Sequence, residues 1–135
     1  MTDEKRDRGA RRMKDVCGID APPPGLGRFT DITVEHLFGE VWENQALAVR
    51  DRRLVVLGIL AALGDADNLG VHFGQALARG DLTPEEVDEI VVTIAHYAGW
   101  PRSTHALAAA GKAKTAFSTA GSTPRPATTT QPPER

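Results

Sequence analysis

The side chain best suited to chemistry in this sequence is a histidine on an otherwise apolar helix face. His72 shares a helical spacing with four apolar residues, Leu69, Phe73, Ala76 and Leu77, so the pattern predicts that its imidazole points inward. A buried imidazole needs a polar partner, and histidine changes its charge near neutral pH. His72 is therefore a candidate for proton transfer, with a structural core histidine as the alternative.

Other kinds of site are disfavoured by the residues present. Cys17 is the single cysteine, which excludes an intramolecular disulfide, a CxxC pair and a thiolate zinc cluster; we expect a small buried residue without a catalytic role. The sequence has no His-x-x-x-His or carboxylate pair at metal-ligand spacing around its four histidines, His36, His72, His96 and His105, so we expect no metal. Of these, we expect His36 and His105 on the surface and His96 in solvent or at a subunit interface. No nucleotide loop is indicated, and we predict no cofactor.

The elements that must position these residues are helices of one domain. An apolar stripe (Val34, Leu37, Phe38, Val41 and Trp42) predicts a helix over residues 29–42 with one buried face. Residues 50–63 begin with charged side chains and continue in a run, residues 54–63, that is apolar on every side. We interpret this segment as the core helix, although its β-branched residues leave a strand open. A further helix begins after Asp65 or Asp67 and ends at Gly80. Thr83, Pro84 and Glu86 form a capping box that starts the next helix, which Gly99 ends. A last, alanine-rich helix is expected over residues 103–117.

The two ends of the chain differ from this middle part. We predict a charged, peripheral N-terminal arm and a Pro/Gly linker in residues 1–28, a helical domain in residues 29–117, and a disordered Thr/Pro-rich tail in residues 118–135. The formal net charge of −2 provides no basic field for nucleic acid or an anionic membrane. The longest apolar run, residues 54–63, is too short to span a bilayer, and we expect a cytoplasmic protein.

An ordered series of motifs resembles the carboxymuconolactone decarboxylase family. The series runs over about residues 8–112 and comprises Phe38-Gly39-Glu40-Val41-Trp42, Leu47, Arg52-Arg53-Leu54, Ala62-Leu63-Gly64, His72, Ala76, Gly80, Leu82-Thr83-Pro84-Glu85-Glu86 and Tyr97-Ala98-Gly99-Trp100-Pro101. The resemblance implies an all-α fold of about six helices, shared with alkyl hydroperoxidase D-like proteins and assembled as a trimer or hexamer. Large apolar faces on short helices favour association independently.

The resemblance also implies a reaction in aromatic compound catabolism. The family removes carbon dioxide from 4-carboxymuconolactone or a related small carboxylated lactone, without a cofactor, to give an enol lactone. The peroxidase branch of the superfamily instead uses Cys-x-x-Cys-x-x-x-His with an upstream glutamate. The matching positions here are Asp65, Asn68, His72 and Arg53, so thiol peroxidase chemistry is excluded.

The family positions suggest a role for each residue of the site. Arg52 would anchor a substrate carboxylate, or else pair with Asp51 or Glu40. His72 would donate a proton, or else be a core histidine bonded to Glu40 or Tyr97. Glu40 would orient His72 or act as a base, with a surface ion pair as the alternative. Trp42, Tyr97 and Arg53 are the expected substrate-binding residues. The alternative for Trp42 is the core, where such a residue is more often found, and the alternative for Tyr97 is to cap the core.

Three departures from the family pattern leave other functions open. The family typically has Arg-Pro-Gly where this chain has Asn44-Gln45-Ala46, a serine at Arg53, and Gln or His near Thr93. These changes alter the charge and size of the pocket. The alternatives are a non-catalytic oligomeric ligand-binding or accessory protein, and a lyase or isomerase acting on a larger aromatic or polyketide-like substrate.

Overall fold

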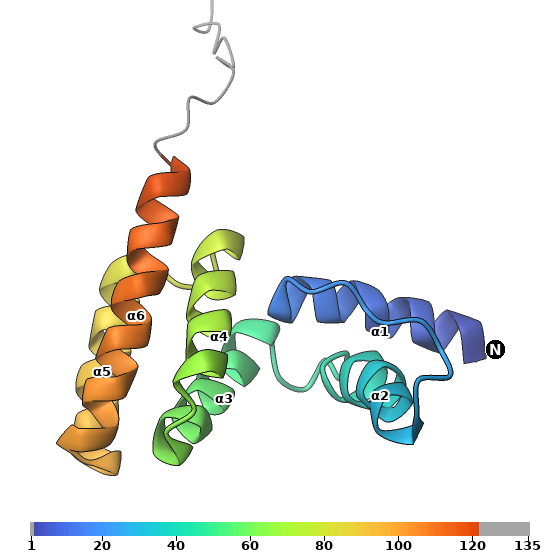
Figure 1. Cartoon of the computed structure of the whole chain (residues 1–135), viewed down its shortest axis with the longest axis horizontal. Coiled ribbons are helices and arrows are strands. Elements are labelled where there is room, and N and C mark those ends of the chain that lie inside the picture. The colour runs from blue at the N-terminus through green and yellow to red at the C-terminus, as the bar shows by residue number, and fades with distance from the viewer. Residues whose placement is uncertain (1, 122–135) are drawn as a thin grey trace, which may run out of the picture.

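The structure is a computed structural model that describes residues 2–121. It is all-α, as the sequence predicts, and its elements are α1 (Thr2–Cys17), α2 (Arg28–Ile32), the π-helix η1 (Thr33–Val41), α3 (Val49–Leu63), α4 (Ala66–Arg79), α5 (Pro84–Ala98) and α6 (Trp100–Gly121). Figure 1 shows α1 and α2 side by side at one end of the molecule and α3 to α6 packed at the other, with α6 projecting past its neighbours. No helix within these residues is long and apolar enough to cross a membrane.

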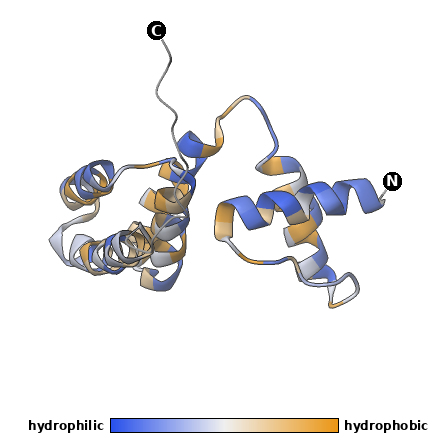
Figure 2. Ribbon diagram, turned by 90° about the horizontal axis from the view of Figure 1, so that it is seen from above, coloured by the Kyte–Doolittle hydropathy of each residue, from blue (hydrophilic) through white to orange (hydrophobic). Residues whose placement is uncertain are grey.

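Two apolar clusters hold the molecule together. The larger one is formed by α3 to α6 and includes Leu57, Phe73, Leu77 and Val87. The smaller one joins α1 to η1 through Val16, Phe38 and Trp42. Figure 2 shows the hydrophobic sides of the helices turned toward one another within each group. The site described below lies where the two groups meet.

The helix ends follow the local signals in the sequence. Asp65 caps α4 by accepting a hydrogen bond from the Asn68 backbone, and Gly80 ends α4 in the left-handed conformation. Thr83 and Glu86 form the capping box of α5 with proline in the first turn. These boundaries confirm the predictions for α4 and α5, and α3 confirms the helix rather than the strand.

The predicted helix over residues 29–42 is different in the structure. A short α-helix changes into a π-helix at Thr33, and the Trp42 backbone N–H donates to the Leu37 carbonyl oxygen over 2.9 Å, five residues back. The wider turn breaks the expected stripe: Val34, Phe38 and Trp42 are buried, whereas Leu37 is 39% exposed. π-helical turns are rare and are frequent at functional sites.

The N-terminal helix is part of the packed structure rather than a peripheral arm. Gly9 of α1 is buried against η1, where an added Cβ would overlap the Val34 carbonyl oxygen, and a Cβ on Gly39 would lie 2.8 Å from the Lys5 carbonyl oxygen. These two glycines allow the helix backbones to approach closely. Val16 is fully buried as a result.

The last helix is longer than the sequence predicts. It starts at Trp100, because Pro101 lies in the first turn, where its missing N–H is not needed. It ends at Gly121, so residues 118–121, predicted as the start of a disordered tail, are helical. The remaining residues of that prediction, 122–135, lie outside the described part of the chain.

The close contact of α1 with η1 gives a stability prediction. Gly9→Ala forces the two helices apart, and we expect it to destabilise the protein by about 1–3 kcal/mol, as overpacking does. Gly111→Ala is the matched control, since an added Cβ there meets no atom within 4 Å and alanine favours a helix by about 0.5–1 kcal/mol. Thermal unfolding should show a lower Tm for the first variant and an equal or higher Tm for the second. Equal Tm values for Gly9→Ala and the wild type would contradict this packing.

Candidate functional site

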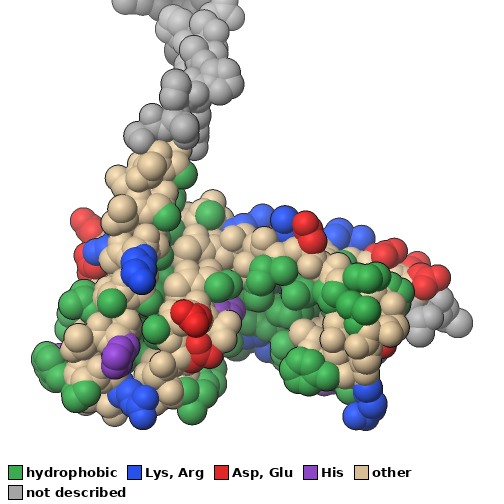
Figure 3. Space-filling view, viewed as in Figure 1, with side chains coloured by type: hydrophobic (Ala, Val, Ile, Leu, Met, Phe, Trp, Pro, Cys, Tyr) green, Lys and Arg blue, Asp and Glu red, His purple; other side chains and the backbone are tan. Residues whose placement is uncertain are grey.

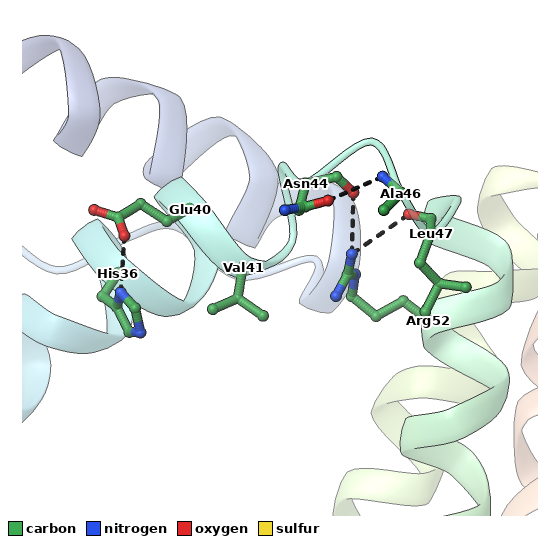
Figure 4. A pocket seen from close by; sticks show the side chains of 7 residues that line it. All are labelled: His36, Glu40, Val41, Asn44, Ala46, Leu47 and Arg52. Atoms are coloured by element: carbon green, nitrogen blue, oxygen red, sulfur yellow. Dashed lines mark hydrogen bonds and ion pairs between the residues drawn. The ribbon is translucent and has the colours of Figure 1, made fainter.

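A pocket of about 410 Å³ lies where the end of η1 meets the start of α3. Its lining residues are His36, Glu40, Val41, Asn44, Ala46, Leu47 and Arg52 (Figure 4). The loop between the two helices forms one wall, and η1 forms the other. The pocket therefore contains two of the predicted catalytic residues, Arg52 and Glu40.

Arg52 presents a positive charge that no carboxylate neutralises within the described residues. Its Nη2 donates to the Asn44 carbonyl oxygen over 3.0 Å and lies 3.5 Å from the Leu47 carbonyl oxygen. Its Nε is buried and has no hydrogen-bond partner, and its guanidinium lies 5.9 Å from the centre of the Trp42 ring. A guanidinium supported by carbonyls and an aromatic ring, with an unused donor, can bind an anion.

Glu40 forms a surface network rather than a contact with His72. Its carboxylate pairs with Lys5 of α1 and lies 3.0 Å from His36 Nδ1. His36 and Glu40 are four residues apart on η1, and both side chains are partly exposed. Glu40 therefore forms the surface ion pair that the sequence suggests as its alternative role. His36, its neighbour on η1, also lines the pocket.

Behind the pocket, Trp42 connects Arg52 to the buried histidine. Trp42 is only 5% exposed, and its ring stacks on Phe38 and on His72, with 6.4 Å between the ring centres in both pairs. Because Arg52 also lies against this indole ring, Trp42 is a shared neighbour of Arg52 and His72, the two principal candidates from the sequence. His72 itself is not among the residues that line the pocket.

The polar partner of His72 is Arg53. His72 is 9% exposed, as its position on the inner face of α4 predicts, and Arg53 is fully buried. The Arg53 Nη1 lies 3.2 Å from His72 Nδ1. Burial, and then the charge of Arg53, lower the pKa of His72 from 6.5 to about 4. The imidazole is therefore neutral at pH 7.

The remaining predictions for the site can now be compared with the structure. Arg53 is fully buried and is not among the residues that line the pocket; Asp81 partly balances its charge at 3.4 Å. Tyr97 is 92% exposed, so it neither caps the core nor lies with Arg52. The expected alternatives for Arg52 are not observed, since neither Asp51 nor Glu40 pairs with it. No cluster of possible metal ligands occurs among residues 2–121.

Sequence reasoning missed two contributors to this region. His36 was expected to be an ordinary surface residue, although its spacing of four from Glu40 is the signal for a pair on one helix face. The backbone carbonyl of Val16, which accepts from Arg53 over 2.8 Å, could not be identified, because every residue has a carbonyl and only the tertiary fold selects one.

The shifted pKa of His72 predicts how stability depends on pH. In the unfolded chain the imidazole has its ordinary pKa of 6.5, and in the folded protein it is about 4. Between these values the unfolded state binds more protons, so the free energy of unfolding falls as the pH falls from about 6.5 to about 4. Urea unfolding at several pH values should show that His72→Asn flattens this dependence. His105→Asn, at an exposed position, is the control and should leave it unchanged; a flat wild-type profile would contradict the burial of a neutral His72.

Two known proteins are similar to this chain over part of its length. The chain is similar to 4-carboxymuconolactone decarboxylase of Acinetobacter baylyi, with 33% identity over 79 residues, 58% of each chain. It is also similar to nitrosuccinic acid decarboxylase of Metarhizium robertsii, with 30% identity over 108 residues, 75% of each chain. The match spans little more than half of the first relative. Both relatives are named decarboxylases.

The family match covers most of the described helices. Residues 27–112, from the start of α2 to the middle of α6, match the family model. This range includes the pocket, Trp42 and the Arg53–His72 pair. The chain therefore belongs to the carboxymuconolactone decarboxylase family.

Proposed function

We propose that this protein is a cofactor-independent decarboxylase of a small carboxylated lactone, such as 4-carboxymuconolactone, or of a related small acid. The observation that carries the proposal is Arg52, a guanidinium that lines a pocket, is held by backbone carbonyls and has no carboxylate partner among the described residues. A charge in this state is suited to an anionic ligand. The relatives' names supply the reaction class.

The two substrates named by the relatives share one chemical property. Each carries two carboxylates and an electron-accepting group, a lactone carbonyl conjugated through a double bond in one and a nitro group in the other. When the bond to the departing carboxylate breaks, carbon dioxide leaves and the electron pair moves onto an oxygen of that group. A proton is then added at carbon. The substrate accepts the electrons, so the protein has to bind the anion, stabilise the new oxyanion and deliver a proton.

In this mechanism Arg52 holds the carboxylate that remains on the substrate. A small acid bound at Arg52 lies beside Trp42, whose ring His72 also contacts. The sequence suggests His72 as the proton donor, but a pKa of about 4 leaves too little imidazolium at neutral pH. His72 does not itself line the pocket, so its neutral N–H reaches only a substrate that extends from Arg52 past the Trp42 ring. For such a substrate we assign to this N–H the stabilisation of the oxyanion, as a hydrogen-bond donor. The His36–Glu40 pair, which lines the pocket, is the proposed source of the proton.

Turnover by purified variants tests this assignment. The wild type should release carbon dioxide from 4-carboxymuconolactone or from nitrosuccinate, followed by ultraviolet absorbance. Arg52→Ala removes a charge-assisted contact worth about 1.5–3 kcal/mol, so we expect kcat/KM to fall about 10- to 100-fold. Arg52→Lys should recover only part of it, because lysine lacks the planar fork.

The control for this experiment is Arg28→Gln, which removes an exposed arginine of α2 that does not line the pocket. It should turn over substrate like the wild type. Equal kcat/KM values for Arg52→Ala and Arg28→Gln would contradict the anchoring role. A folded wild type that releases no carbon dioxide from either compound would contradict the proposed reaction and favour the accessory protein.

The size of the pocket is compatible with a second class of substrate, larger aromatic or polyketide-like acids. The pocket volume of about 410 Å³ lies within the range of pockets that hold drug-sized ligands. Such ligands are larger than a small lactone. This observation favours testing the lyase or isomerase reading on larger aromatic or polyketide-like acids with the same variants.

We further propose that the chain forms a homo-oligomer, a trimer or a hexamer, in the cytoplasm. Val55, Ile59 and Leu63 form a stripe along α3 and are 55%, 53% and 70% exposed. On α5 and α6, Val92, Trp100 and Leu107 are 49%, 64% and 56% exposed. Figure 3 shows hydrophobic side chains reaching the surface on the same half of the molecule. The sequence predicts residues 50–63 as a fully buried helix, so a second copy of the chain would cover the half that one chain leaves open.

Sedimentation equilibrium tests the assembly. The wild type should have three or six times the mass of one chain, and Ile59→Asp should reduce it, because a charge on the α3 stripe is costly to bury. Leu26→Asp changes an exposed apolar residue outside the helices and should leave the mass unchanged. A monomeric wild type would contradict the proposal.

A further inference from the structure

Arg53 is a fully buried charged residue that the proposed decarboxylation does not use directly. It follows Arg52 on α3, yet its side chain is 0% exposed, since consecutive residues of an α-helix point about 100° apart. A buried guanidinium is costly unless its donors are satisfied and its charge is balanced. The groups that contact Arg53 therefore indicate its role in the structure.

Those partners come from three separate parts of the chain. Nη1 donates to the Val16 carbonyl oxygen at the end of α1 over 2.8 Å and lies 3.2 Å from His72 Nδ1 on α4. Nε and Nη2 each lie 3.4 Å from Asp81 Oδ2, in the turn between α4 and α5. Nη2 also lies 3.5 Å from the Asp15 carbonyl oxygen. The guanidinium is thus held by backbone carbonyls of α1 and by the Asp81 carboxylate, and it also contacts the His72 imidazole.

The chemistry of the guanidinium decides the state of the imidazole. Arginine has five N–H donors and no acceptor, so a hydrogen bond between Arg53 Nη1 and His72 Nδ1 requires Nδ1 to carry the lone pair. The proton of the neutral ring must then be on Nε2. We propose that Arg53 is a positioning residue that fixes His72 as the neutral Nε2–H tautomer, with that N–H directed away from α3.

The charges around His72 agree with this state. Burial of His72 and the charge of Arg53 both disfavour the imidazolium. The other titratable groups that act on this pair are Cys17 of α1, Arg79 of α4 and Asp81 of the following turn. Burial also raises the pKa of the Cys17 thiol, so Cys17 stays uncharged at neutral pH. Asp81 is the one carboxylate of this set, and it contacts Arg53 rather than the imidazole.

The tautomer of His72 does not depend on the proposed function, but the use of that tautomer in catalysis does. A histidine bonded to a carboxylate gains basicity and tends toward the imidazolium. A histidine bonded to arginine is held neutral and can act only as a hydrogen-bond donor through Nε2. Such a donor stabilises an oxyanion without transferring its proton, which suits a reaction in which the substrate supplies the electron acceptor. The arginine at position 53 thereby determines which of two histidine chemistries is available.

The tautomer can be observed in the ligand-free protein without any activity assay. Long-range ¹H–¹⁵N spectra of ¹⁵N-histidine-labelled protein, assigned with His72→Asn, should show His72 protonated at Nε2 and unprotonated at Nδ1 from pH 5.5 to 8. In Arg53→Met the signal should move toward a tautomer mixture, and the pH at which the ring titrates should rise. Arg53→Lys, which retains a donor and a charge, should preserve the Nε2–H form.

Arg79→Gln is the control, because it removes a nearby charge that has no hydrogen bond to His72, and it should leave the tautomer unchanged. If Arg53→Met does not fold, the wild-type spectrum and Arg53→Lys decide the matter alone. A wild-type His72 that is Nδ1–H or cationic at pH 7 would overturn the proposal. So would an Nε2–H tautomer that persists in folded Arg53→Met. An Nε2–H tautomer lost only in Arg53→Met, in a protein that releases no carbon dioxide, would support the positioning role and reject the decarboxylase.

Discussion

The buried guanidinium of Arg53 is the interaction on which the arrangement of this molecule depends. It joins the Val16 carbonyl of α1, the His72 imidazole of α4 and the Asp81 carboxylate of the next turn. Without those partners the charge could not be buried between the two groups of helices. The same contacts join α1 to α4, beside the Trp42 ring that neighbours both Arg52 and His72. The fold and the candidate site therefore share one electrostatic constraint.

This constraint needs a close approach of α1 that the sequence encodes in glycine. The Val16 carbonyl reaches Arg53 only if α1 lies against η1, and the backbones approach at Gly9 and Gly39, where no Cβ could be accommodated. The π-helical turn of η1 has a related consequence, since it places Phe38 and Trp42 in the small cluster with Val16 and turns Leu37 outward. Glycines and an irregular helix thus bring backbone carbonyl oxygens at the end of α1 to a buried charge.

Local signals explain why much of the fold could be predicted from the sequence. Capping residues such as Thr83 and left-handed glycines such as Gly80 act within one helical turn, so they need no knowledge of distant residues. The inward direction of His72 followed from its periodicity in the same way. The predictions that differ from the structure concern long-range packing: the charged composition of residues 1–17 predicts a peripheral arm, and the sequence suggests Glu40 or Tyr97 as the partner of His72. The burial of Arg53 is a further result of long-range packing, because a buried arginine is unexpected from sequence.

The adjacent arginines show how environment separates two functions of one residue type. Arg52 and Arg53 are neighbours on the same helix, and both contact backbone carbonyls. Arg53 also contacts the Asp81 carboxylate and the His72 imidazole. Its charge is therefore partly balanced within the protein, and it acts on His72. Arg52 has an aromatic ring and an unused Nε, so its charge is left for a ligand. An anion at Arg52 would place negative charge near a histidine that Arg53 holds neutral, so the anion and Arg53 would act on the imidazole in opposite directions. The buried position of Arg53, 3.2 Å from Nδ1, favours the neutral ring in that balance, because electrostatic effects are strongest at short distance and low exposure.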